Sequence, residues 1–133
     1  MFLACLSVSI AAQNEADCPD VKSAQGALVG PFRVFNTAEM EYRARNHRFA
    51  DVNELFGFEG LKNRATTAYA HPGPNSAAIG TTADPIPGYD VRLTNTSDGT
   101  AYTILATKKD SPCKLAGAAT DNRGVIYLME PLR

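Results

Sequence analysis

Residues 32–56, with the sequence FRVFNTAEMEYRARNHRFADVNELF, decide the fold of this chain. The first part of the stretch predicts an amphipathic helix, because its apolar residues recur at spacings of three and four. The expected apolar face consists of Leu28, Phe32, Phe35 and Tyr42, flanked by Val34 and Ala38, and the opposite face carries Arg33, Glu39, Arg43 and Arg45. Glu39 precedes Arg43 by four residues, the orientation that favours a surface ion pair. Asn46 and His47 end the expected helix.

Shorter signals lie before, within and after this helix. Asp20 can cap its start. Gly30-Pro31 interrupts the pattern, and proline lacks the backbone N–H and clashes with the preceding turn, so a kink or a fresh start is expected there. After the helix, Asp51-Val-Asn-Glu54 has the form of a capping box. A second, short helix is therefore expected, ending at Gly57 or Gly60.

The C-terminal half has the patterns of strands and turns. Tyr89–Thr94 alternates apolar and polar residues, Asn95–Thr100 supplies a turn, and a strand returns over Ala101–Thr107. A weaker strand candidate spans Leu115–Thr120, and the last expected strand is Val125–Met129.

Between the two halves, residues 62–88 have no clear periodicity and are rich in Gly and Pro, which predicts exposed turns. A short strand at Ala68–Ala70 is an open alternative within this loop.

These elements predict an α+β domain. A meander of three or four antiparallel strands with one apolar face needs a cover, and the helix over Phe32–Arg45 is the only expected element long enough to provide it. The expected fold is thus an N-terminal amphipathic helix packed on a three- to four-stranded antiparallel sheet, with a short second helix. A chain of 133 residues forms one such domain.

The first dozen residues are apolar and small, and polar residues follow. Residues 1–12 are therefore expected to be a secretory signal peptide, with small residues at Ser9 and Ala11 for cleavage. Residues 13–26 form a polar segment and residues 27–133 the globular domain. Two alternatives stay open: a lipoprotein leader ending at Cys5, and a frayed apolar N-terminus of a cytosolic protein. Export, to the periplasm or the cell exterior, is the favoured interpretation.

The three cysteines fit export. Removal of the leader with Cys5 leaves Cys18 and Cys113, an even pair in an oxidising compartment. A disulfide between them would close a loop of about 95 residues and add roughly 4 kcal/mol of stability on the chain-entropy argument. A reactive or metal-binding thiol is the weaker interpretation, because no CxxC spacing or adjacent histidine is present.

The order of the elements resembles the globular head of type IV pilins and of the pseudopilins of type II secretion. In that family a long helix carries an Asn-Thr-Ala-Glu-like run, a short capped helix follows, and an antiparallel sheet ends in an Asp-x-x-Gly-Val-Ile turn. The matching residues here are Asn36-Thr-Ala-Glu39, Arg45-Asn-His-Arg-Phe49, Gly88-Tyr89, Asp98-Gly99, Tyr102 and Asp121-Asn-Arg-Gly-Val-Ile126. The resemblance covers about residues 27–129.

The resemblance has one clear departure. Family members begin with a basic leader, a prepilin processing site and a long apolar anchor helix, and this sequence has none of the three. The resemblance therefore implies a pilin-like head that works by protein–protein contact, without implying prepilin processing or polymerisation through a helical core.

The sequence offers few groups for catalysis or metal binding. His47 at the helix end and His71 in a Pro-Gly loop are the only histidines, and neither has further ligands at metal spacing. Ser76, Ser97 and Ser111 lack the Gly-x-Ser-x-Gly setting of a hydrolase nucleophile. We therefore expect no catalytic residue, no metal site and no cofactor.

Two sets of charged residues are candidate binding features. Asp121, Asn122 and the Arg123 carbonyl could form part of a calcium loop, but a plain turn fits the spacing better. Arg43, Arg45 and Arg48, with Lys108-Lys109, could meet an acidic partner, although a solvated helix face is the simpler interpretation. The net charge of −1 gives no positive field for nucleic acid, so no nucleic-acid partner is expected. No segment is long enough to span a membrane.

Two functions of different classes follow. The first is an exported, non-enzymatic pilin-like interaction protein of the cell envelope or of a secretion or pilus-type assembly, binding through the loop from Ala65 to Pro87 or through a sheet edge. The alternative is a small exported enzyme or ligand-binding module, with His47 or His71 in a pocket beside Asp84 or Asp121. A weaker, third interpretation is an export-associated domain with no partner of its own.

Overall fold

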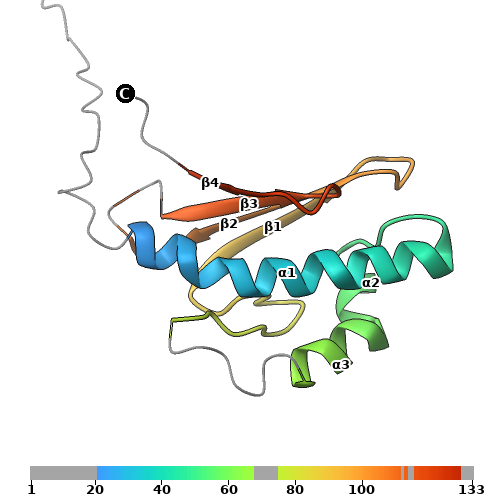
Figure 1. The fold of residues 1–133 in the computed structure, drawn as a ribbon, viewed down its shortest axis with the longest axis horizontal. Coiled ribbons are helices and arrows are strands. Elements are labelled where there is room, and N and C mark those ends of the chain that lie inside the picture. Colours follow the sequence, from blue (N-terminus) through green and yellow to red (C-terminus); the bar gives the residue numbers. More distant parts are fainter. Residues whose placement is uncertain (1–20, 68–74, 112, 114–115, 130–133) are drawn as a thin grey trace, which may run out of the picture.

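The computed structural model describes residues 21–67, 75–111, 113 and 116–129. Within these residues the chain forms helices α1 (Val21–Asn46), α2 (Val52–Gly57) and α3 (Glu59–Thr67), followed by strands β1 (Tyr89–Asn95), β2 (Tyr102–Lys108), β3 (Gly117–Asp121) and β4 (Ile126–Leu128). The strands form one antiparallel sheet in the order β1-β2-β3-β4 (Figure 1). The α+β prediction, with a long N-terminal helix on a meander and a short second helix, is confirmed.

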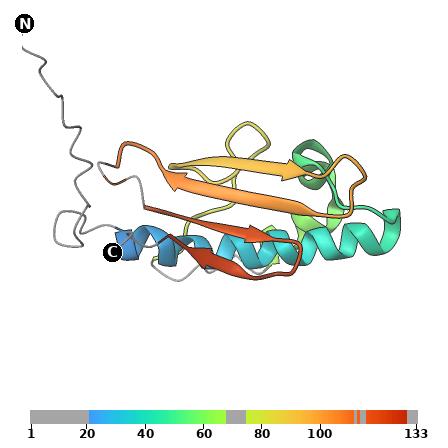
Figure 2. The same cartoon turned by 90° about the horizontal axis from the view of Figure 1, so that it is seen from above.

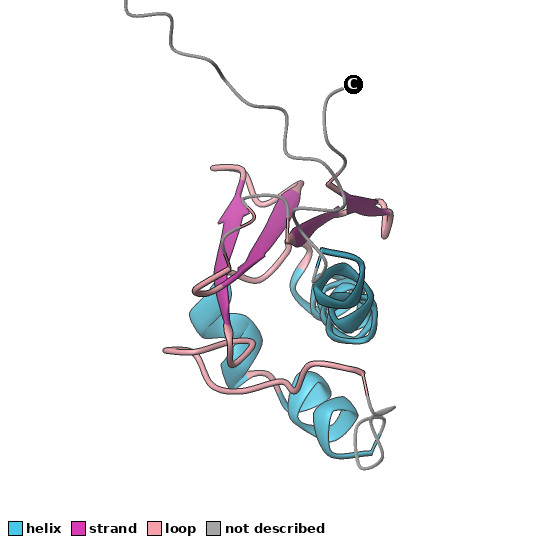
Figure 3. Ribbon diagram, turned by 90° about the vertical axis from the view of Figure 1, so that its left-hand side faces the viewer, coloured by secondary structure: helices cyan, strands magenta, loops and turns pink. Residues whose placement is uncertain are grey.

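The helices lie on one side of the sheet, and no described helix covers the other side (Figure 3). α1 runs along the β3–β4 side of the sheet, where it packs mainly against β3 (Figure 2). α3 packs against α1 and α2. The inner face beside β1 is covered instead by α2 and by the loop that leads into β1, in which Ile86 is fully buried.

The core forms where α1 meets the inner face of the sheet. Leu28, Phe32 and Phe35 of the predicted apolar stripe are each at most 1% exposed. They pack in one cluster with inward side chains of β2 such as Ile104. Burying each of these side chains contributes about 2 kcal/mol or more, so the stripe accounts for much of the attachment of α1 to the sheet.

Phe49 joins the end of α1 to the sheet. Its ring meets that of Tyr102 edge to face, with 4.9 Å between the ring centroids. Nearby, the amide of Phe49 donates to the carbonyl of Gly99 in the β1–β2 turn (2.9 Å). Gly99 has a φ of +70°, and a Cβ there would lie 2.8 Å from the Cβ of Arg48. Glycine is therefore needed both for the turn and for its close contact with the loop after α1.

The fresh start expected at Pro31 does not occur, because α1 continues through that residue. Proline removes the bond that its N–H would give to the carbonyl four residues earlier, which is that of Ala27. Here the amide of Ala77 donates to this carbonyl (2.9 Å). A loop far away in the sequence thus satisfies the acceptor that Pro31 leaves open.

The predicted capping box is confirmed. The Asp51 side chain accepts from the Glu54 amide (2.8 Å), and the Glu54 side chain accepts from the Asp51 amide (3.2 Å). α2 ends at Gly57, one of the two predicted ends.

The hairpin of β1 and β2 and the later strands lie close to their predicted positions, whereas α3 falls in a region predicted to be loop. α1 begins at Val21, so residues 21–26 of the predicted polar segment belong to this helix, and Ala24 and Gln25 are buried. The predicted leader, the Asp20 cap and the possible strand at Ala68–Ala70 lie outside the described residues.

Candidate functional site

The groups predicted for acid–base chemistry are not assembled into a site in the described structure. His47 is exposed just after α1, with a positive φ of 60°, and its amide donates to the Arg43 carbonyl (2.8 Å). None of the hydrogen bonds or ion pairs described joins it to Asp84 or Asp121. His71 lies outside the described residues.

The carboxylate of Asp121 already has protein partners. It accepts from the Arg123 guanidinium (2.8 Å) and from the Tyr127 hydroxyl (3.0 Å), and these contacts lower its pKa. Gly124 has a φ of +73°, and its amide donates to the Asp121 carbonyl (2.9 Å). The segment is a turn between β3 and β4, in which both carboxyl oxygens of Asp121 accept hydrogen bonds from the protein itself. Within the described part of the chain, no three His, Cys, Asp or Glu residues form a group suited to a metal.

The basic cluster at the end of α1 is engaged with groups of the protein itself. Arg48 forms an ion pair with Glu54 and lies 5.7 Å from the centroid of the Tyr42 ring. Its hydrogen bonds to Glu54, aided by one from Tyr42, hold the pKa of that carboxyl at about 2.

The neighbouring arginines also have partners. Arg43 lies 5.0 Å from the centroid of Phe49, and Arg45 lies over Phe58 at 5.4 Å and pairs with Glu41 (3.1 Å). These ring contacts and ion pairs hold the three arginine side chains against the rings of Tyr42, Phe49 and Phe58.

Glu39 is the main correction to the sequence interpretation. It was expected on the charged face with Arg43, but it is 0% exposed. It lies four residues after Phe35 and three before Tyr42, so the apolar stripe of the helix passes through it. One carboxyl oxygen, Oε2, accepts from the Ala50 amide (2.7 Å), while Oε1 has no partner among the described residues. Burial, with the charges of Glu54 and Asp51, raises the pKa of Glu39 to about 8.

Asn36 belongs to a second buried polar group. Its Nδ2 donates to Thr120 Oγ1 (2.8 Å), and its Oδ1 accepts from the Tyr102 hydroxyl (2.6 Å). Thr120 Oγ1 in turn donates to the Val125 carbonyl (2.8 Å). The two polar ends of the Asn36-Thr-Ala-Glu39 run thus face the protein interior, where one fastens α1 to the sheet and the other fastens it to the loop before α2.

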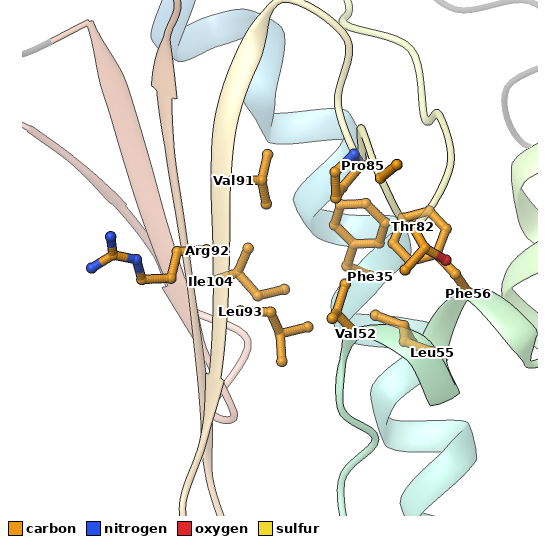
Figure 4. Close-up of a pocket in the computed structure, with 11 residues that line it drawn as sticks. Phe35, Val52, Leu55, Phe56, Thr82, Pro85, Val91, Arg92, Leu93 and Ile104 are labelled. Carbon is orange, nitrogen blue, oxygen red and sulfur yellow. The ribbon is translucent and has the colours of Figure 1, made fainter.

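An apolar pocket of about 260 Å³ lies beneath β1 (Figure 4). β1 and β2 form one wall, α1 and α2 the floor, and the loop before β1 the remaining side. Its principal lining residues are Phe35, Leu55, Phe56, Val91, Leu93 and Ile104. Arg92 also borders the pocket, but its guanidinium points to the opposite side of the sheet (Figure 4).

The pocket is lined mainly by apolar side chains. Among the described residues that line it, none carries a carboxyl, imidazole or thiol group, and Thr82 alone has a hydroxyl. Thr82 has no base among the lining residues to activate it. A ligand or side chain that entered the pocket would therefore be held by burial of apolar surface.

The other predicted residues lie elsewhere. Asp84 pairs with Lys109 at 3.7 Å, where both side chains are nearly half exposed. Cys113 is buried, but Cys18 lies outside the described residues, so the disulfide between them stays a prediction. No described helix is long and apolar enough to cross a membrane.

Comparison of the chain with protein families, with curated proteins and with solved structures finds no match. The functional argument therefore depends on the residues and their geometry.

The sequence interpretation missed the pocket and the burial of Glu39. A signal for Glu39 was present in the spacing of the apolar stripe. The pocket had no signal in the sequence, because its lining residues come from five separate segments of the chain.

Proposed function

We propose that this chain is an exported, non-enzymatic, pilin-like protein that acts by protein–protein contact in the cell envelope or in a secretion or pilus-type assembly. The observation that carries the proposal is the β1 edge of the sheet, which pairs with no further strand among the described residues and lies beside a mainly apolar pocket. Edge strands and apolar pockets of this kind bind other chains. The order of long helix, short capped helix and antiparallel meander supports the pilin-like part.

The pocket also gives some support to the alternative of a ligand-binding module. It is smaller than the usual range for drug-sized ligands, which begins at about 300 Å³. Its place beside an edge strand favours the side chain of a bound protein over a free small molecule. An enzymatic role has no support from the described groups.

Mass spectrometry of the native protein, recovered separately from the cytoplasm, envelope and medium, tests the export part of the proposal. The expected result is a chain outside the cytoplasm that has lost the apolar leader and Cys5. Cys18 and Cys113 should take up an alkylating label only after reduction, as a disulfide requires. A full-length chain confined to the cytoplasm with three alkylatable thiols would contradict the proposal.

A further inference from the structure

β1 lies at one edge of the described sheet, where β2 is its strand partner. Two backbone hydrogen bonds show which residues on the β1 side are bonded to the β2 side. The Lys109 amide donates to the Gly88 carbonyl (2.9 Å) at one end, and the Thr96 amide donates to the Ala101 carbonyl (3.0 Å) at the other. In an antiparallel pair, every second residue exchanges backbone hydrogen bonds with the partner strand. Because Gly88 and Thr96 are bonded in this way, the N–H and C=O groups of Val91 and Leu93 point away from β2. No hydrogen bond in the described structure occupies them.

The pocket lies on the side of β1 to which the side chains of Val91 and Leu93 point (Figure 4). A strand added to this edge would place every second side chain on the same side. Those side chains would meet the apolar groups of α2, such as Leu55 and Phe56, and Pro85 of the loop. An incoming strand could thus form backbone bonds to β1 and bury apolar side chains at the pocket in one binding mode.

The other face of β1 carries two charges of opposite sign. Asp90 and Arg92 are both exposed, and neither forms an ion pair in the described structure. The intervening side chains of an added strand would lie directly opposite them, where opposite charges attract and like charges repel. The β1 edge therefore favours a partner strand with apolar residues on the pocket side and with charges in the complementary order on the other side.

We propose that the β1 edge binds an extended peptide segment of a partner protein, antiparallel to β1, with the sequence apolar–acidic–apolar–basic. The two apolar residues lie opposite Leu93 and Val91, the acidic residue opposite Arg92 and the basic residue opposite Asp90. This inference rests on the proposed function, since it names the chemistry of the protein contact assigned there.

The opposite edge is a poorer site for such a peptide. β4 has only three residues, Ile126–Leu128, and the described pocket does not reach it. At its end the Met129 carbonyl already accepts a hydrogen bond from the Gln25 side chain of α1. β4 therefore serves as the internal control for binding at β1.

Two synthetic peptides with the core sequences Leu-Glu-Leu-Lys and Leu-Lys-Leu-Glu, each flanked by Gly and Ser, test the proposal on the whole purified protein. Amide chemical shifts followed by NMR report both affinity and position. The first peptide should bind about tenfold more tightly, since it gains two opposite-charge pairs where the second has two like-charge pairs. The shifts should centre on Val91 and Leu93, with β4 unaffected.

Two further measurements test the contribution of the charge order and that of the backbone hydrogen bonds separately. The double variant Asp90→Arg, Arg92→Asp should reverse the preference between the peptides. An N-methyl group on the peptide residue opposite Val91 should abolish binding without altering the protein, because it removes a backbone donor. Equal binding of both peptides, binding by neither, or shifts centred on β4 would overturn the inference. If an envelope partner is nevertheless found by crosslinking, the proposed function stands with its contact elsewhere.

Discussion

The Glu39→Gln variant should become progressively more stable than the wild-type protein as the pH rises from 5 to 8. The folded protein raises the pKa of this carboxyl from 4.5 to about 8, so protonation favours folding. The wild-type stability is therefore fully present below about pH 4.5 and is lost as the pH rises through 8, at roughly 1.4 kcal/mol per pH unit within that window. The difference between the two proteins should reach up to about 4 kcal/mol at pH 8.

Urea denaturation of both proteins at pH 5, 6, 7 and 8 measures this difference. Gln keeps an oxygen acceptor for the Ala50 amide and cannot ionise, so the two proteins should be nearly equal at pH 5. Glu59→Gln is the matched control, because Glu59 is exposed in the first turn of α3. Parallel pH profiles for the wild-type protein and Glu39→Gln would contradict the burial of Glu39.

The second large effect is expected for Asn36→Ala. The substitution leaves the Tyr102 hydroxyl without its acceptor and Thr120 Oγ1 without its donor, in a region closed to water. Each buried polar group left unpaired costs about 1–3 kcal/mol, so the variant should lose about 3 kcal/mol of stability. Thr37→Ala, one residue along on the exposed side of α1, should lose less than about 1 kcal/mol.

A double-mutant cycle with Tyr102→Phe separates the hydrogen bond from the loss of packing. Once Tyr102 has lost its hydroxyl, removal of the Asn36 side chain should cost less, and the two effects should be clearly non-additive. Strict additivity would show that the two side chains do not interact in solution.

The elements with strong local signals could be predicted from the sequence. Alternation identified β1 and β2, a pair of carboxylates at the right spacing identified the capping box, and the spacing of Leu28, Phe32 and Phe35 identified the buried side of α1. In each case the residues that stabilise the element lie within one or two turns of each other, or within one strand, so the pattern is visible locally.

The features that the sequence did not predict share a physical reason. In each case the contacts that decide the structure are made by residues distant in the sequence. Leu61 is the one apolar side chain of α3 that is buried among those described, and the helix gains its support from packing on α1 and α2. Pro31 is accommodated because Ala77 supplies the missing hydrogen bond. A charged residue such as Glu39 is assigned to the surface by default, and only the fold supplies the Ala50 amide that it bonds.

The site was harder to predict than the fold. The sequence suggested a sheet edge or the loop before the sheet as a binding surface, but it did not indicate which edge. That choice follows from the strand order, from the outward backbone groups of Val91 and Leu93, and from the pocket between β1 and α2. None of these can be seen without the arrangement of the elements in space.

Photo-crosslinking in living cells tests the central claim, that this protein works by contact with another protein at the β1 edge. A photoreactive side chain is placed at Thr94 on β1 and, as the control, at Thr107 on β2, which lies on the same outer face but is not in the edge strand. The account predicts a discrete crosslinked protein from Thr94 in the envelope fraction and little from Thr107. No crosslink from either position, or equal crosslinks from both, would contradict it.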